Sequence, residues 1–201
     1  MKGPSELSLA FSPLAPDRWA DLEALFGPRG ACAGCWCMWW RLGRSDFERG
    51  KGAANREALR AIVEAGPPPG LLAYDHRQPV GWCALAPREA YSRLARARTL
   101  KPLDERLVWS VTCFFVARPY RRRGVTAELL KAAARWAASR GATILEGYPV
   151  DTRGRFTADA FAYTGLPSAF EAAGFREAAR PSPTRPIMRL SLTGRDSGEA
   201  G

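Results

Sequence analysis

Residues 108–150 read VWSVTCFFVARPYRRRGVTAELLKAAARWAASRGATILEGYPV. The β-branched and aromatic residues over 107–117 predict a buried strand. A short basic turn follows, and polar residues then recur every three or four positions between 128 and 139, which predicts an amphipathic helix to about residue 140. Residues 143–150 are again mostly apolar and predict a second strand. A strand, a helix and a strand in this order indicate a βαβ unit whose two strands run parallel.

The remaining residues predict strands and helices in a mixed order. Strands are expected at 7–14, 71–74, 80–86, 175–179 and 187–192, and helices at 17–25 and 55–65, with Asn55 as the N-cap of the second. This order predicts an α/β (α+β layered) fold with a mixed, partly parallel central sheet flanked by helices. We expect a single domain over residues 1–201, with its core at about 7–192 and a flexible tail at 193–201.

The composition limits the class of protein. No apolar run approaches the ~20 residues that span a bilayer. Five cysteines are an odd number, which does not suit a secreted disulfide framework, so we expect a cytoplasmic protein with reduced thiols. The net charge is +10, and residues 88–123 hold ten basic residues against three acidic ones. Such a cluster attracts nucleic acids and phosphorylated cofactors. The alternative is that the excess of arginine reflects only a bias in the amino-acid composition.

The turn at 118–126 has the features of a phosphate site. The N–H groups of residues 123–126 stand at a helix N-terminus, where they lack helical partners and the helix dipole favours an anion. Gly124 lets a phosphate approach the backbone without a Cβ in the way. The turn is not a Walker loop, because no Gly-Lys-Ser/Thr follows, and it is not a Gly-x-Gly-x-x-Gly dinucleotide turn.

Residues 116–126, VARPYRRRGVT, resemble the signature of the GNAT superfamily, which is Arg/Gln-x-x-Gly-x-Gly/Ala after a strand. Residues 173–177, AGFRE, resemble the last helix-to-strand corner of the same superfamily, so the resemblance covers about residues 7–192. It implies an N-acetyltransferase in which an amine attacks the thioester of acetyl-CoA directly. Acetyl-CoA is then the acyl-donor substrate, and no metal is expected.

The resemblance also implies where the cofactor binds. In this superfamily the strand before the signature splays from its neighbour, and its free backbone groups pair with the pantetheine arm. Those residues would be Phe114, Phe115 and Val116. The pyrophosphate would lie on the amides of Arg121, Arg122, Arg123, Gly124, Val125 and Thr126.

The sequence departs from the family pattern at two positions. Thr126 stands where the family usually has Gly or Ala, but its hydroxyl can donate to a phosphate oxygen. Phe170 stands where the family often has a tyrosine that protonates the departing thiolate. Tyr163, Tyr148 or solvent could supply that proton instead, or the protein could bind acyl-CoA without turnover.

Glu146, on the strand after the helix, is the candidate general base. The alternative is that its carboxylate pairs with one of the many arginines. The basic run at 88–101 could be functional, as a lid or as a segment that recognises an anion. The alternative is an ordinary solvated surface.

An aromatic and thiol-rich segment lies at residues 30–52. Trp36 and Trp39 would form part of an acceptor-binding wall, with ordinary core packing as the alternative. Three thiols at Cys32, Cys35 and Cys37 could contribute to a zinc site, but a fourth ligand is lacking, so a packed and reduced cluster is favoured.

Two other function classes stay open from the sequence. One is a non-catalytic acyl-CoA-binding protein, and the other is a basic nucleic-acid-binding module. The sequence lacks helix-turn-helix, zinc-finger and RNP signatures, so we do not expect nucleic acid as a partner. We expect a small-molecule acyl acceptor, whose identity the sequence does not give, and no membrane partner. The sequence leaves the oligomeric state open, and a homodimer is one of the options.

Overall fold

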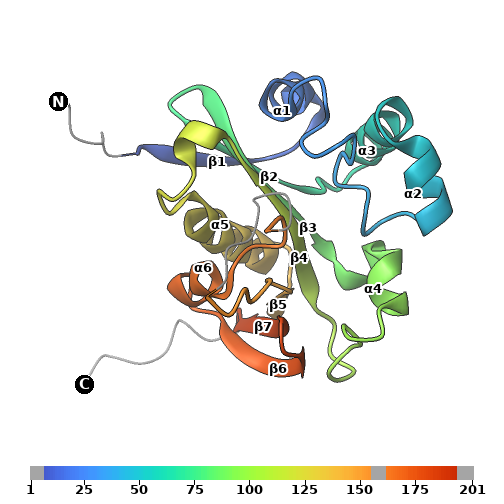
Figure 1. The fold of residues 1–201 in the computed structure, drawn as a ribbon. Helices are drawn as coiled ribbons and strands as arrows, with labels where there is room; N and C mark the ends of the chain where they lie inside the picture. Colours follow the sequence, from blue (N-terminus) through green and yellow to red (C-terminus); the bar gives the residue numbers. More distant parts are fainter. Residues whose placement is uncertain (1–6, 155–161, 194–201) are drawn as a thin grey trace.

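The computed structural model describes residues 7–154 and 162–193. They form one seven-stranded sheet in the order β1-β2-β3-β4-β5-β7-β6 (Figure 1). The strands are β1 (Leu9–Pro13), β2 (Gly70–Asp75), β3 (Gln78–Pro87), β4 (Trp109–Val116), β5 (Ile144–Gly147), β6 (Arg176–Ser182) and β7 (Arg185–Ser191). The pair β4–β5 is parallel and the other pairs are antiparallel. The predicted mixed, partly parallel sheet is confirmed.

Helices cover both faces of the sheet (Figure 1). They are α1 (Trp19–Phe26), α2 (Arg44–Gly50), α3 (Ala53–Ala65), α4 (Ser92–Arg96), α5 (Val125–Ser139) and α6 (Pro167–Ala172). One apolar core joins α5 and α6 to one face of the sheet, and a second joins α1 and α3 to the other. No helix in residues 7–154 and 162–193 is long and apolar enough to cross a membrane.

The helix α5 follows the sequence pattern closely. Leu129, Leu130, Ala133 and Ala137 are fully buried against the sheet, as expected for the apolar face of an amphipathic helix. Gly141 follows the helix with φ +83°, a left-handed conformation that glycine adopts without steric cost.

The start of α3 differs from the prediction. The helix begins at Ala53, after Gly52 as its N-cap, and Asn55 lies inside its first turn. The Asn55 side chain is buried, and its Nδ2 donates to the carbonyls of Gly34 and Phe47, each at 3.3 Å. Asn55 therefore donates to one carbonyl of an earlier loop and one of α2 rather than capping its own helix.

The sheet opens between β4 and β5. These strands pair only over residues 109–111 and 145–147, while β4 continues for five further residues along β3. The predicted strand at 143–150 is thus shorter, and it ends at Gly147. A register shift places Leu85 opposite Val111 and Ala84 opposite Cys113, so Thr112 is an extra residue in β4. This bulge turns Phe114 towards the α5 core and Cys113 towards the opposite core.

Candidate functional site

A short turn that contains Arg118–Tyr120 and Gly124 connects β4 to α5. Gly124, the N-cap of α5, has φ +81°, and Arg122 before it has φ +59°. The first bond of the helix runs from the N–H of Glu128 to the carbonyl of Gly124 at 3.1 Å. The N–H groups of Val125, Thr126 and Ala127 therefore have no acceptor within the helix and face outward at its positive end. A Cβ built on Gly124 would meet nothing within 4 Å, so this side of the turn is open.

A groove of about 650 Å³ runs from this turn along the open edge of β4. It brings together eight of the nine predicted cofactor residues, namely Phe114, Phe115, Val116, Arg121, Arg122, Gly124, Val125 and Thr126. Arg123 is not part of the lining, and its guanidinium lies 5.6 Å from the centre of the Tyr120 ring. Tyr120 of the turn also lines the groove. The opposite wall comes from Thr152 and several residues between 162 and 172, of which only Tyr163 was predicted to be functional. No local signal identifies that wall, because it forms only when α6 packs beside α5.

The backbone of β4 is less free than predicted. The N–H of Phe114 donates to the carbonyl of Tyr163 at 2.6 Å, and the carbonyl of Val116 accepts from Nε of Arg121 at 2.9 Å. The N–H of Val150, after β5, donates to the carbonyl of Gly165 at 2.9 Å. Residues 163–165 thus bridge the two splayed strands. A pantetheine arm that pairs with the Phe114 N–H would have to replace the Tyr163 carbonyl.

The two tyrosines proposed as acids occupy different places. Tyr163 lines the groove and is partly exposed, and burial is the main cause that raises the pKa of its phenol to about 12. Tyr148 is fully buried and does not line the groove, and its hydroxyl donates to Glu146 at 2.6 Å. Burial, and then the Glu146 charge, raise the pKa of Tyr148 above its ordinary range. Of the two, Tyr163 is the one placed to reach a ligand in the groove.

Phe170 lies in an apolar pocket and has no exposed surface. Its ring makes edge contacts with Phe114 and Phe175, at centroid distances of 6.0 Å and 5.1 Å. A Cβ on Gly147 would lie 2.1 Å from this ring, so the glycine is needed for the ring to fit. Phe170 is therefore a packing residue with no proton to donate.

Glu146 lies in a buried ion-pair cluster. Its Oε1 accepts from Arg88 at 3.0 Å, and its Oε2 accepts from Arg189 at 2.7 Å. Arg189 also bonds Asp104 at 2.6 Å, and Arg88 donates to Tyr148. The hydrogen bonds from Arg106 and Arg189 lower the pKa of Asp104 below its ordinary range. The Glu146 carboxylate is not in the groove lining, so its geometry favours the ion-pair alternative over the base role.

The two tryptophans predicted to bind the acceptor also differ. Trp36 is 5 % exposed and stacks on Trp19 at a centroid distance of 6.0 Å, which is the core-packing alternative. A buried ring of this kind has no surface to offer an acceptor. Trp39 is partly exposed at the edge of the same core, and the guanidinium of Arg93 lies 3.7 Å from the centre of its ring.

The cysteines are all free. The thiol of Cys37 contacts that of Cys113 at 3.3 Å, and Trp82 Nε1 donates to Cys37 at 3.2 Å. Burial is the main cause that raises the pKa of Cys35 to about 12. Within residues 7–154 and 162–193, no group of three or more His, Cys, Asp or Glu side chains is arranged to hold a metal ion.

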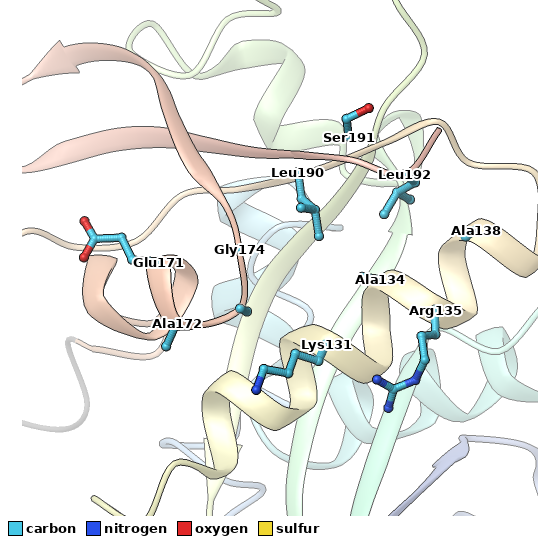
Figure 2. Close-up of a pocket in the computed structure, with 11 residues that line it drawn as sticks. Lys131, Ala134, Arg135, Ala138, Glu171, Ala172, Gly174, Leu190, Ser191 and Leu192 are labelled. Atoms are coloured by element: carbon cyan, nitrogen blue, oxygen red, sulfur yellow. The ribbon is translucent and has the colours of Figure 1, made fainter. Parts of the chain in front are cut away.

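A second hollow of about 500 Å³ lies between α5, α6 and β7 (Figure 2). Lys131 and Arg135 of α5 and Glu171 of α6 contribute its polar lining, and Ala134 and Leu190 are among its apolar residues. It contains no residue of the β4–α5 turn. Of the two hollows, it is therefore the groove along β4 that contains both the turn before α5 and the open edge of β4.

The comparison with known families agrees with this geometry. The model of the acetyltransferase (GNAT) family matches residues 36–153, which is more than half of the chain. The chain belongs to the GNAT acetyltransferase family. A GNAT acetyltransferase takes its acetyl group from acetyl-CoA, so acetyl-CoA-dependent transfer is the general reaction of this chain.

Solved structures show the same GNAT fold at low sequence identity. A structure described as a putative GNAT acetyltransferase from Desulfovibrio desulfuricans is 15% identical, with a TM-score of 0.53, and the match covers 92% of this chain and 100% of that one. The PaiA N-acetyltransferase of Thermoplasma acidophilum, solved with coenzyme A, is 14% identical, with coverage of 92% and 99% and a TM-score of 0.51. The YncA structure from Salmonella typhimurium, with acetyl-CoA, is 13% identical, with coverage of 96% and 99% and a TM-score of 0.51. A search of curated proteins gave no match.

Proposed function

We propose that this GNAT chain transfers the acetyl group of acetyl-CoA to a primary amine of a small molecule by direct attack on the thioester. The observation that carries the proposal is the single groove that joins the amides of the β4–α5 turn to the open edge of β4. A ligand with a pyrophosphate at one end and a long arm at the other matches a site with this shape.

Each part of the cofactor has a partner in this proposal. The pyrophosphate binds at the N–H groups of Val125 and Thr126, where the helix dipole and the absence of a side chain at Gly124 favour it. The Thr126 hydroxyl donates to a phosphate oxygen. The pantetheine arm lies against Phe115 and Val116, and the thioester reaches the Tyr163 end of the groove.

The reaction needs one bond to form, one to break and two proton transfers. The amine nitrogen attacks the thioester carbonyl, and collapse of the tetrahedral intermediate expels the thiolate of CoA. Tyr163 gives its proton to this thiolate and is reprotonated by solvent, and the amine loses its proton to water. The elevated pKa of Tyr163 keeps the phenol in its acid form at neutral pH.

The alternative is an acyl-CoA-binding protein without turnover. The buried ring of Phe170, at the position where the family often has a proton-donating tyrosine, is the observation that favours it. The two functions share the groove and differ in whether thiol is released.

Two broader parts of the proposal concern the whole chain. We place the protein in the cytoplasm, and the five free cysteines support a reducing compartment. We also treat residues 1–201 as a single domain. Most of the tail predicted at 193–201 lies outside the described residues.

The first experiment is thermal unfolding with and without acetyl-CoA, followed by a free-thiol assay over a panel of amines. Acetyl-CoA at 100 times its Kd should add about 2.7 kcal/mol to the free energy of unfolding. A stability gain with thiol release for one class of amine supports the transferase. A gain without release from any amine supports the binding protein, and no gain at millimolar acetyl-CoA contradicts both.

A further inference from the structure

Arg93, in the short helix α4, is held rigidly beside the aromatic segment. Its backbone N–H donates to the carbonyl of Trp40 at 3.1 Å, and its Nε donates to the carbonyl of Leu42 at 3.0 Å. The guanidinium lies 3.7 Å from the ring centre of Trp39 and 5.8 Å from that of Phe47. Trp39 and Phe47 are themselves in edge contact at 5.1 Å. Backbone and rings therefore fix the orientation of this cation before any ligand arrives.

One donor of this fixed cation is left without an acceptor. Nη2 of Arg93 is buried and has no hydrogen-bond partner in the described part of the chain. Buried donors are nearly always paired, and an unpaired donor on a charged group is especially unfavourable. A guanidinium donates only, so the missing partner must be an acceptor, and a carboxylate matches it best.

The charges around Arg93 point to an anionic ligand. Burial is the main cause that lowers the pKa of Arg93, and the positive charge of the nearby Arg44 is the second cause. The carboxylate of Glu48 is also near, but Lys51 holds it at 2.5 Å. The surplus of positive charge favours a negative group and disfavours a polycation.

Arg93 does not line the groove, but it lies near Tyr163, at the end of the groove where the thioester is expected. Tyr163 lines the groove, and Arg93 and Tyr163 are close enough that each affects the pKa of the other. Trp39 and Tyr163 both pack at the edge of the core that contains α1 and α3. Nη2 is buried in the structure, so a ligand reaches it only after a neighbouring side chain moves.

We propose that the acceptor is an amine that also carries a carboxylate, and that Arg93 binds this carboxylate through Nη2 at the Tyr163 end of the groove. The inference rests on the proposed transferase function and adds the class of its substrate. Trp39 then positions Arg93 rather than contacting the acceptor. Binding of the carboxylate orients the amine towards the thioester.

The test compares matched amines in the thiol-release assay. Each pair is an L-amino acid and its amide, for example phenylalanine and phenylalaninamide, glutamine and its α-amide, or alanine and alaninamide. Spermidine serves as a polycationic amine. The wild-type enzyme should prefer the amino acid in at least one pair, with a KM lower by a factor of about ten or more, as expected for a hydrogen bond to a charged group. Spermidine should be a poor substrate.

The variant Arg93→Met should remove this preference. The KM of the amino acid should rise about ten-fold or more, while the KM of the amide stays within about three-fold, since only the carboxylate loses a partner. The variant Arg93→Lys keeps the charge without the planar fork and should recover part of the preference. Arg96→Met removes an exposed arginine of the same helix and should leave both KM values unchanged.

Two controls separate this inference from the proposed function. Acetyl-CoA should stabilise Arg93→Met as much as the wild type, because Arg93 lies outside the groove lining. If acetyl-CoA does not bind, or no amine releases thiol, the proposed transferase itself fails. If thiol is released but no amino acid is preferred over its amide, if spermidine is the best substrate, or if Arg93→Met keeps the preference, the carboxylate assignment is wrong.

Discussion

At the scale of single residues, Glu146 shows that position along a strand does not fix a chemical role. Its two oxygens accept hydrogen bonds from Arg88, Arg189 and Tyr148, and the carboxylate is fully buried. A base must reach the amine in the groove, and Glu146 is not among the residues that line the groove. The cluster instead joins β5, β7 and the segment before α4.

Replacement of Glu146 therefore tests a structural role against a catalytic one. Glu146→Gln should lower the free energy of unfolding by about 3–5 kcal/mol, because the buried guanidinium of Arg88 loses its counter-ion and Arg189 keeps only Asp104. Urea unfolding measures this change. Glu128→Gln, which removes an exposed partner of Lys131, should cost about 0.5 kcal/mol or less. A variant that keeps wild-type stability but turns over about 100-fold more slowly would instead make Glu146 the base.

Replacement of Tyr163 tests the proton donor. Tyr163→Phe should slow turnover about 100-fold or more, with the affinity for acetyl-CoA nearly unchanged, because the variant loses a proton and little packing. The acid must be protonated to act, and burial raises its pKa to about 12. The wild-type turnover rate should therefore show no decline from loss of this proton up to about pH 10. An unchanged turnover rate in Tyr163→Phe would assign the proton to solvent.

At the scale of elements, α5 is flanked by two glycines with nearly the same positive φ but different surroundings. Gly124 precedes the helix with φ +81° and Gly141 follows it with φ +83°. A Cβ would meet no atom within 4 Å at either position. The difference is that Gly124 lines the groove and Gly141 does not.

This pair separates backbone strain from cofactor binding. Gly124→Ala and Gly141→Ala should each lower the free energy of unfolding by about 1 kcal/mol, since alanine is strained at positive φ. Gly124→Ala alone should weaken acetyl-CoA binding, by about ten-fold or more, because its Cβ obstructs the contact between phosphate and amides. Titration calorimetry and urea unfolding measure the two effects. Equal affinity in both variants would place the pyrophosphate elsewhere.

At the scale of the whole molecule, the sheet consists of two parts joined by a short parallel pairing. The strands β1 to β4 form one part, and β5, β7 and β6 form the other, with residue pairs only at 109–111 and 145–147 between them. The groove begins where this pairing ends. Residues 163–165 bridge the opening through the bonds to Phe114 and Val150.

Hydrogen exchange tests this arrangement. Acetyl-CoA should slow exchange at the amides of 124–127 and at the open edge of 114–116, where the ligand covers or binds N–H groups. Exchange in α1 and α3, on the other face of the sheet, should not change. Mass spectrometry of peptides resolves these segments. Protection confined to the hollow between α5, α6 and β7 would instead place the cofactor in that hollow.

The sequence was sufficient for features that depend on neighbours along the chain. Residues 108–150 encode a strand, a turn with Gly124 at its end and a helix, because side-chain periodicity, the left-handed preference of glycine and the helix dipole are local properties. Eight of the nine predicted cofactor residues line the groove for the same reason, since all nine lie within thirteen consecutive positions. The mixed, partly parallel sheet also followed from the order of the elements.

The tertiary structure alone decided features that depend on distant partners. Glu146 meets arginines 58 and 43 positions away, and Asn55 meets the carbonyl of Gly34 rather than its own helix end. The bulge at Thr112 exists only relative to β3, and it decides which core receives Phe114. Whether Trp36 and Trp39 are core or surface depends on how one irregular loop packs on α1 and α4. Such contacts follow from strand register and from the packing of side chains across the sheet, and no stretch of sequence contains both partners.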